Sequence, residues 1–254
     1  MDSYFHEPKL STMVVLYTLP MKLDTDELLM KMPLNDTIIK IEKKGRMRRG
    51  ESKRDRIKRR IPKPTTTSGF GHNSVTLVLL TDGFGRKPSK EVTIKIFHNG
   101  VFHLTGIPHE DYERSAIDIL LSAMKELPAS CFLEQPASWD NPVRRVVLMN
   151  FTTSFRETCP KVSRLGILGY FHTRGIRVDF EPDVDPAVKI RFPEKWTARI
   201  FRTGKINLTA LTSRDDCLTF IERLNDYFTD YYTSPSHSQA HTALPPPQTA
   251  PLLQ

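Results

Sequence analysis

The sequence predicts an α+β protein made of two similar halves, each an antiparallel sheet with helices on one face. A fourteen-residue phrase at 93–106, TIKIFHNGVFHLTG, returns at 197–210 as TARIFRTGKINLTA, with six identical positions at an offset of 104 residues. Each phrase is followed by a polar start and then by an amphipathic helix pattern. Two copies of about a hundred residues are too long and too few for a solenoid, so they indicate a pseudo-two-fold domain.

Within each half the expected order is strand, helix, several strands, helix. The first helix is expected at about 24–32 with Asp24 as its N-cap, and strands at 75–80, 92–97 and 101–105. Asn99-Gly100 predicts the turn of the last hairpin. In the second half the corresponding strands are 187–192, 197–201 and 205–209. The two long helices are predicted by apolar stripes, Ala116, Leu120, Ala123, Met124 and Leu127 in the first half and Leu218, Ile221, Leu224 and Phe228 in the second.

The first half is longer than the second because it contains a basic insertion. Val14-Val15-Leu16 matches Val146-Val147-Leu148 at an offset of 132 residues, which is 28 more than the offset of the phrases. Residues 40–63 hold thirteen Lys or Arg and three acids, a net charge of +10, whereas the whole chain carries +8. The rest of the chain is therefore close to neutral, and one segment supplies its basicity.

Like charges repel, so we expect the insertion, about 41–68, to be disordered in the free protein. It has the composition of an arm that lies on phosphates and releases counterions, and equally that of a solvated loop or a nuclear-import signal. The expected basic contacts are Lys43, Lys44, Arg46, Arg48, Arg49, Lys53, Arg54, Arg56, Lys58, Arg59, Arg60 and Lys63.

Strand alternation divides the repeated phrases into two faces. Ile94, Ile96, Phe102 and Leu104 in the first half, and Ala198, Ile200, Ile206 and Leu208 in the second, should lie under the helices. The opposite face carries Lys95, Phe97, His103 and Thr105, matched by Arg199, Phe201, Asn207 and Thr209. A phenylalanine at the same place on a cationic face in both halves is typical of a nucleic-acid platform, although both rings could instead fill gaps in the core.

These phrases resemble those of the TATA-box-binding protein family, in which each repeat carries a segment close to L-I-F-x-S-G-K-x-V-x-T-G before its long helix. The counterparts here are 95–100 with Thr105-Gly106 and 199–205 with Thr209-Ala210. The opening TMVVLYTLPMKLD at 12–24 also resembles the first strand and turn of that family. The resemblance covers about 12–228 without the insertion, and its divergence is similar to that of the TATA-binding-protein-like factors of large nucleocytoplasmic DNA viruses.

The resemblance implies one curved antiparallel sheet, a saddle with helices on its convex face and a concave face that binds promoter DNA in the minor groove. It also implies a transcription initiation factor, a monomer on DNA, with a partner similar to transcription factor IIB and the RNA polymerase machinery. The side chains it assigns to DNA contact are Phe97, Phe201, Thr105, Thr209, Lys95, Arg199, His103, Asn207, Thr12, Val14, Arg144, Val146 and Arg191. Arg144 follows from the offset of 132, and Asn150 is the alternative if that register slips.

The sequence departs from the family pattern in ways that bear on DNA binding. The family inserts two phenylalanines per repeat, whereas Phe97 and Phe201 match only one of each pair. The expected position of the second ring falls at 73–75 in the first half, with Phe70 upstream, and at Asp185-Pro186 in the second. We therefore expect duplex DNA binding with a weaker or altered A·T preference.

Other function classes receive less support from the sequence. The glycine-rich segments GFGHN and GFGRKPSK match neither a dinucleotide nor a P-loop pattern, and no catalytic, metal or cofactor arrangement is legible, so no enzyme is expected. A protein-interaction adaptor that uses the saddle without DNA would require Phe97 and Phe201 to be covered, for example by Trp139 or the N-terminal arm. Recognition of RNA or a hybrid duplex, as an accessory to a nuclease in trans, is the third possibility.

The expected domain organisation follows the repeats. It is an arm at 1–10, a first repeat at 11–128, a linker at 129–141, a second repeat at 142–232 and a disordered proline-rich tail at 233–254. Three widely spaced cysteines and the absence of a signal sequence or a long apolar run predict a reducing compartment without membrane contact. The resemblance implies that this compartment is the nucleus or the cytoplasmic viral factory of an infected cell.

Overall fold

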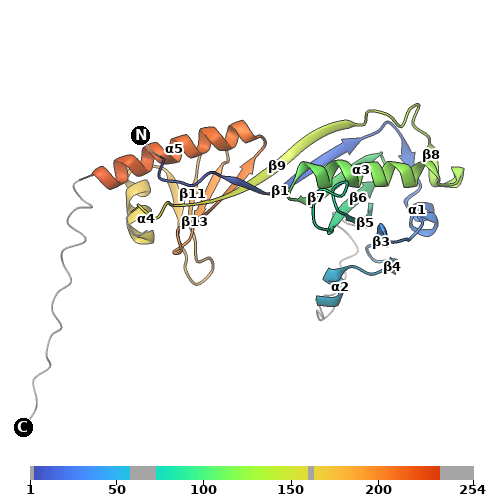
Figure 1. Cartoon of the computed structure of the whole chain (residues 1–254), viewed down its shortest axis with the longest axis horizontal. Coiled ribbons are helices and arrows are strands. Elements are labelled where there is room, and N and C mark those ends of the chain that lie inside the picture. The colour runs from blue at the N-terminus through green and yellow to red at the C-terminus, as the bar shows by residue number, and fades with distance from the viewer. Residues whose placement is uncertain (1–2, 58–72, 160–162, 235–254) are drawn as a thin grey trace, which may run out of the picture. The chain divides into compact units, whose positions relative to one another are not determined.

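The computed structural model describes residues 3–57, 73–159 and 163–234, and they divide into two compact units. The larger unit contains residues 10–151 with 210–213, and the smaller contains the N-terminal residues up to 9, then 152–209 and the segment from 214 onward. Each unit is an antiparallel sheet with helices, shown in Figure 1. Residues 58–72 and 235–254, which include the end of the basic segment and the proline-rich tail, lie outside the described residues.

The larger unit is a sheet in the order β9-β1-β7-β6-β5-β3-β4. Its strands are β1 (Lys9–Thr18), β3 (Ile38–Lys43), β4 (Arg48–Gly50), β5 (Ser74–Thr81), β6 (Lys90–Phe97), β7 (Val101–Ile107) and the first part of β9 (Val143–Ser154). Its helices are α1 (Thr25–Lys31), α2 (Lys53–Ile57) and α3 (Glu110–Lys125). A separate sheet pairs β2 (Lys22–Leu23) with β8 (Phe132–Glu134). Strand β8 and the short 3-10 helix η1 (Ala129–Cys131) lie in the expected linker.

The smaller unit repeats this plan with fewer elements, in the order β10-β11-β12-β13-β9. Its strands are β10 (Arg177–Asp179), β11 (Val188–Arg191), β12 (Thr197–Ile200), β13 (Lys205–Leu211) and the end of β9. Its helices are α4 (Arg164–Thr173) and α5 (Arg214–Thr233). Phe5 of the N-terminal segment is 1% exposed and packs against Phe155 and Phe228 in this core.

Local sequence explains where several elements begin and turn. The Asp24 carboxylate caps α1 by accepting the N–H groups of Asp26 and Glu27 at 2.9 and 3.0 Å, as expected from the sequence. The hairpin β6–β7 turns at Gly100 with φ +77°, and a Cβ there would lie 2.2 Å from the carbonyl oxygen of Leu19. Only glycine therefore fits this turn, which confirms the Asn99-Gly100 prediction.

Both cores lie on the face that the alternation predicted. The apolar sets of the two repeated phrases, Ile94, Ile96, Phe102 and Leu104 with Ala198, Ile200, Ile206 and Leu208, are all 0% exposed. Helix α3 covers this face of β5, β6 and β7 in the larger unit (Figure 1). In each unit we call the opposite side of the sheet the open face.

Candidate nucleic-acid interface

The open face of the larger unit carries two rows of side chains in register across its strands. Antiparallel pairing places partners on the same side of the sheet, so each row is continuous. One row, from β3 to β7, is Glu42, Thr76, Lys95 and His103, and the next is Lys40, Val78, Thr93 and Thr105. The surface is polar and cationic, as the sequence predicted for Lys95, His103 and Thr105.

Phe97 ends β6 on this open face and is half-buried, neither sealed in the core nor fully exposed. Its pairing partner across the sheet is Ser74, which is 2% exposed and whose Oγ has no hydrogen-bond partner among the described residues. A serine therefore occupies the place where a second aromatic ring was sought in this repeat. Phe70, the other candidate, lies outside the described residues.

The open face of the smaller unit carries the matching rows. They are Lys189, Arg199 and Asn207, then Arg191, Thr197 and Thr209. Phe201 follows β12 and is half-buried like Phe97. The Arg199 guanidinium carbon lies 5.7 Å from the centroid of the Phe201 ring, within the range of a cation–π contact. A phenylalanine and a basic side chain, Lys95 or Arg199, thus recur at equivalent places in the two units.

Acidic side chains hold several of these cations in place. The Asp185 carboxylate accepts from the Arg199 guanidinium at 2.7 Å and pairs with the Lys189 ammonium at 2.9 Å. The bond from Lys189 makes the largest contribution to lowering the pKa of Asp185 below its usual value, and the charge of Arg199 adds to it. Asp185 is therefore ionised at neutral pH. Arg191 forms an ion pair with Asp179 of β10. Arg199, Lys189 and Arg191 are therefore oriented by fixed carboxylates.

His103 is the titratable group at the centre of the larger unit's open face. Partial burial, followed by the neighbouring Lys95 ammonium, lowers the pKa of His103 below its usual value. The imidazole is consequently neutral at pH 7, where it can donate one hydrogen bond and accept another. A polyanion bound beside His103 would counter the charge of Lys95 and shift the pKa of His103 upward.

The structure corrects the register that the sequence match gave for β1 and β9. The Leu19 N–H donates to the carbonyl of the hairpin residue Gly100, and the Phe155 N–H donates to the carbonyl of Gly204. Gly100 and Gly204 are equivalent in the repeats, so Leu19 corresponds to Phe155 at an offset of 136 residues (155 minus 19) rather than 132. The short Val-Val-Leu match was a coincidence of composition, and the pairing of Thr12 with Arg144 fails with it.

Arg144 itself is held at the helix side of the larger unit. Its guanidinium donates to the two carboxylate oxygens of Glu113 on α3 at 2.5 and 2.9 Å. Glu113 is 1% exposed and also accepts from the Tyr17 hydroxyl at 2.7 Å. The bonds to Glu113 raise the pKa of Arg144 and, after burial, that of Tyr17. The charge of Arg144 thus balances a buried carboxylate, and the expectation that Arg144 contacts DNA stays a prediction.

The other residues expected on the first strand of each half lie as follows. Thr12 and Val14 flank the buried Met13 on β1, beside an irregularity in the pairing with β7, and both are half-buried. Val146 is half-buried on β9. Asn150, the alternative to Arg144, is half-buried on β9 and its Oδ1 has no hydrogen-bond partner among the described residues. Of the two alternatives on β9, Asn150 is thus the one whose side-chain oxygen is left without a partner among the described residues.

The basic insertion is folded where the structure describes it, and this overturns the expectation of disorder for residues 41–57. Arg49 donates to the carbonyl oxygens of Leu29, Met30 and Met32 at 2.8–3.0 Å, at the end of α1. That place suits a cation because it carries the negative end of the helix dipole. Carboxylates engage four further cations, in the ion pairs Lys43–Asp26, Arg46–Asp26, Arg48–Asp55 and Arg56–Glu51.

Self-repulsion is thus relieved by carboxylates within the insertion, by Asp26 and by carbonyl groups at the end of α1. Among the remaining basic residues, Lys44, Lys53 and Arg54 are exposed. Lys58, Arg59, Arg60 and Lys63 lie outside the described residues.

Comparisons with known proteins identify the fold. No protein-family model matches the chain, and no curated protein sequence matches it either. Among solved structures, the TATA-box-binding protein (TBP) of Methanococcus jannaschii is similar, with a TM-score of 0.57 and 18% sequence identity. The match covers 89% of this chain and 99% of that one. The chain has a TBP-like fold. The α+β antiparallel architecture predicted from the two repeats is thereby confirmed.

Two further properties of the described residues bear on other kinds of site. They contain no group of three or more His, Cys, Asp or Glu side chains that could hold a metal ion. No helix in the same ranges is long and apolar enough to cross a membrane. Trp139 packs edge-on against Phe132 at 5.7 Å, and Phe5 packs against Phe155 at 5.1 Å.

Proposed function

We propose that the protein is a TBP-like DNA-binding factor that binds promoter duplex DNA through the open faces of its two units. The observation that carries the proposal is the recurrence of a half-buried phenylalanine, Phe97 and Phe201, at the same place on two cationic faces within a TBP-like fold. Aromatic rings on a cationic face are the side chains that stack on or wedge between bases.

The composition of the faces favours contact with the sugar-phosphate backbone and groove edges over an apolar fit. Lys95, His103, Arg199 and Asn207 stand in the central rows, and Ser74 and Asp185 stand where further aromatic rings were sought. In the part of the chain that the structure describes, each unit therefore offers one of the expected rings rather than two. We propose a salt-sensitive interaction with a weaker A·T preference, because phosphate contacts dominate affinity and carry no sequence information directly.

The proposal extends to the role of the protein in the cell. A monomer that places two open faces on promoter DNA would serve transcription initiation without catalysis and would recruit a partner similar to transcription factor IIB and the polymerase machinery. The nucleus, or the viral factory in the cytoplasm of an infected cell, is the compartment we propose, with descent from the TBP-like factors of large DNA viruses. A fluorescent fusion followed in infected and uninfected cells would test the compartment.

Selection of bound duplexes from a random pool tests the proposed function directly. We expect recovered DNA to bind the wild-type chain in a gel-shift assay, and the Phe97→Ala and Phe201→Ala variants to bind it more weakly. Phe84→Ala is the matched control, since Phe84 is 51% exposed in the turn between β5 and β6, at the other end of those strands from Phe97. Failure to enrich any duplex, with a folded protein, would favour the adaptor function instead.

A further inference from the structure

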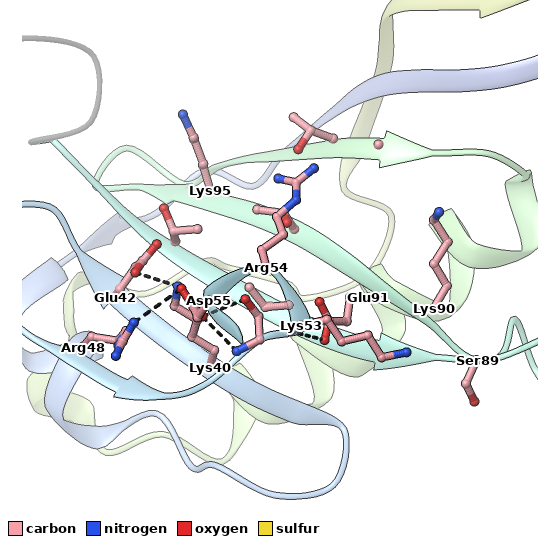
Figure 2. Close-up of a pocket in the computed structure, with 16 residues that line it drawn as sticks. Lys40, Glu42, Arg48, Lys53, Arg54, Asp55, Ser89, Lys90, Glu91 and Lys95 are labelled. Atoms are coloured by element: carbon pink, nitrogen blue, oxygen red, sulfur yellow. Dashed lines mark hydrogen bonds and ion pairs between the residues drawn. The ribbon is translucent and has the colours of Figure 1, made fainter. Parts of the chain in front are cut away.

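The folded part of the insertion forms a wall on the open face of the larger unit. Helix α2 and strand β4 stand over the sheet edge at β3, and they enclose with β5, β6 and β7 an open cleft of about 820 Å³. Its floor is polar, with Thr76, Thr93 and Thr105 from three neighbouring strands. Figure 2 shows this cleft, with Arg54 of α2 and Lys90 and Lys95 of β6 pointing to the same side.

The wall is fixed to the sheet by ion pairs and a hydrogen bond. Lys40 on β3 is 4% exposed, and its ammonium group binds Asp55 of α2 at 3.0 Å and Glu42 at 2.7 Å. The backbone N–H of Lys53 donates to the Glu91 carboxylate on β6 at 2.8 Å. Hydrogen bonds from Ser52 and Lys40 outweigh burial and lower the pKa of Asp55 to about 2, so this anchor persists at neutral pH.

The first turn of α2 is closed by its own sequence. The N–H and hydroxyl of Ser52 both donate to the Asp55 carboxylate, at 2.9 and 2.7 Å. This is the spacing of a capping box, with an acid three residues after the cap reaching back to the cap N–H. A five-residue helix with such a cap and an ion pair to the sheet presents its remaining side chains in a defined direction.

The charge left in the cleft is positive. Its three acids are engaged, since Glu42 and Asp55 bind Lys40 and Glu91 accepts from the Lys53 backbone. Within the described ranges, Arg54 and Lys90 form no ion pair, and Arg54 is exposed. Six basic residues line the cleft against these three acids: Lys40, Arg48, Lys53, Arg54, Lys90 and Lys95. A cleft with a polar floor and cationic rims suits an extended polyanion better than an apolar ligand.

We propose that this cleft holds a stretch of the sugar-phosphate backbone of one DNA strand, with Arg54 and Lys90 binding phosphates over the threonine floor. The inference rests on the proposed DNA-binding function and adds a site to it. Lys90 and Lys95 are five residues apart on β6, which corresponds to about 17 Å at the usual rise of a strand. That length matches roughly five base-pair steps, at ~3.4 Å each. The described part of the insertion, 41–57, then acts as a clamp on the DNA backbone.

The clamp belongs to one repeat. In the smaller unit, β10 takes the place of β3, and the chain continues from β10 to β11 through 180–187 without a counterpart of β4 or α2 in the described residues. The edge there carries Asp179 paired with Arg191. The larger unit would therefore hold its half of the DNA site more tightly than the smaller unit holds the other half. The complex would then have a preferred orientation even on a DNA sequence that is nearly symmetric.

Salt titration of DNA affinity tests the clamp. Each phosphate contact removed should reduce the slope of log affinity against log salt by about 0.9, so we expect Arg54→Ala and Lys90→Ala each to show that loss. Arg114→Ala and Lys125→Ala are the matched controls, because they remove the same charges from α3 on the helix side of the same unit, and they should keep the wild-type slope. Wild-type slopes in Arg54→Ala and Lys90→Ala, with DNA still bound, would overturn the clamp and leave the proposed function intact.

Removing the charge of one DNA phosphate at a time distinguishes direct contact with Arg54 from long-range electrostatic attraction. In each duplex one phosphate is replaced by an uncharged methylphosphonate. At a few positions this replacement should weaken binding of the wild-type chain about as much as Arg54→Ala does. At those same positions it should not weaken binding of the Arg54→Ala variant any further. Additive effects at every position would overturn the assignment of Arg54 to a particular phosphate. Loss of all duplex binding by the folded wild-type chain would instead remove the proposed function, and the clamp with it.

Discussion

Replacement of Arg144 by alanine distinguishes the position expected from the sequence from the one found in the structure. The sequence offset assigned Arg144 to DNA, whereas its guanidinium forms two hydrogen bonds with Glu113, a side chain that is 1% exposed. In the variant the Tyr17 hydroxyl still donates to Glu113, but the buried carboxylate loses its counter-charge. The structure therefore predicts a loss of stability rather than a loss of DNA affinity.

The size of the effect follows from the burial of the two partners. Removing one partner of a fully buried pair costs about 3–5 kcal/mol, because the other charge is left uncompensated. The Arg144 side chain is 43% exposed, so water screens the pair and can partly replace the guanidinium, and we lower the value to about 2 kcal/mol. A loss of that size reduces the folding equilibrium constant by roughly 30-fold.

Urea unfolding followed by circular dichroism measures this loss, and a double-mutant cycle assigns it. In a Glu113→Gln background the Arg144→Ala change should cost much less, because no buried charge remains to be balanced. DNA affinity of Arg144→Ala, measured where the protein is fully folded, should equal that of the wild type. Unchanged stability together with weakened DNA binding would refute the structural assignment and restore the one from sequence.

Three further predictions concern single side chains. Ala210 has φ +67° where the first repeat has Gly106 at φ +74°, so Ala210→Gly should stabilise the chain by about 1 kcal/mol and Gly106→Ala should destabilise it by a similar amount, as measured by thermal unfolding. Because the pKa of His103 is lowered in the folded chain, His103 binds a proton more readily when the chain is unfolded. The free energy of unfolding should therefore fall as the pH drops below about 6.5. The His103→Gln variant should lose that part of the pH dependence. Burial raises the pKa of Cys217 to about 12, so in the folded chain it should react with a thiol reagent far more slowly than the partly exposed Cys159, and equal rates would contradict its burial.

The repeated phrases made the centre of each sheet predictable. Alternation placed Ile94 and Ile200 under the helices and Phe97 and Phe201 on the other side, because strand side chains alternate wherever the pairing is regular. Asp24 was recognised as a cap because its side chain bonds to backbone groups only a few residues away. Features that depend on local periodicity and local hydrogen bonds were therefore visible in the sequence.

The features that were missed depend on contacts between distant residues. The charge run at 40–57 looked self-repelling, but Lys40 meets Asp55, fifteen residues along the run, and other cations meet Asp26 and the carbonyl groups at the end of α1. These groups come together only in the folded chain. One local signal was present, since Ser52-Lys53-Arg54-Asp55 has capping-box spacing and could have indicated α2. Nothing in the sequence connects Arg144 with Glu113, 31 residues away, so its role was not predictable.

DNA bending measured by energy transfer between dyes at the two ends of a selected duplex tests most directly whether the two open faces engage DNA through their rings. We predict that the wild-type chain brings the ends closer, and that the double variant with Phe97→Ala and Phe201→Ala leaves them at the spacing of free DNA. Phe84→Ala should bend the duplex as the wild type does. Full bending by the double variant, at saturating protein, would contradict the account.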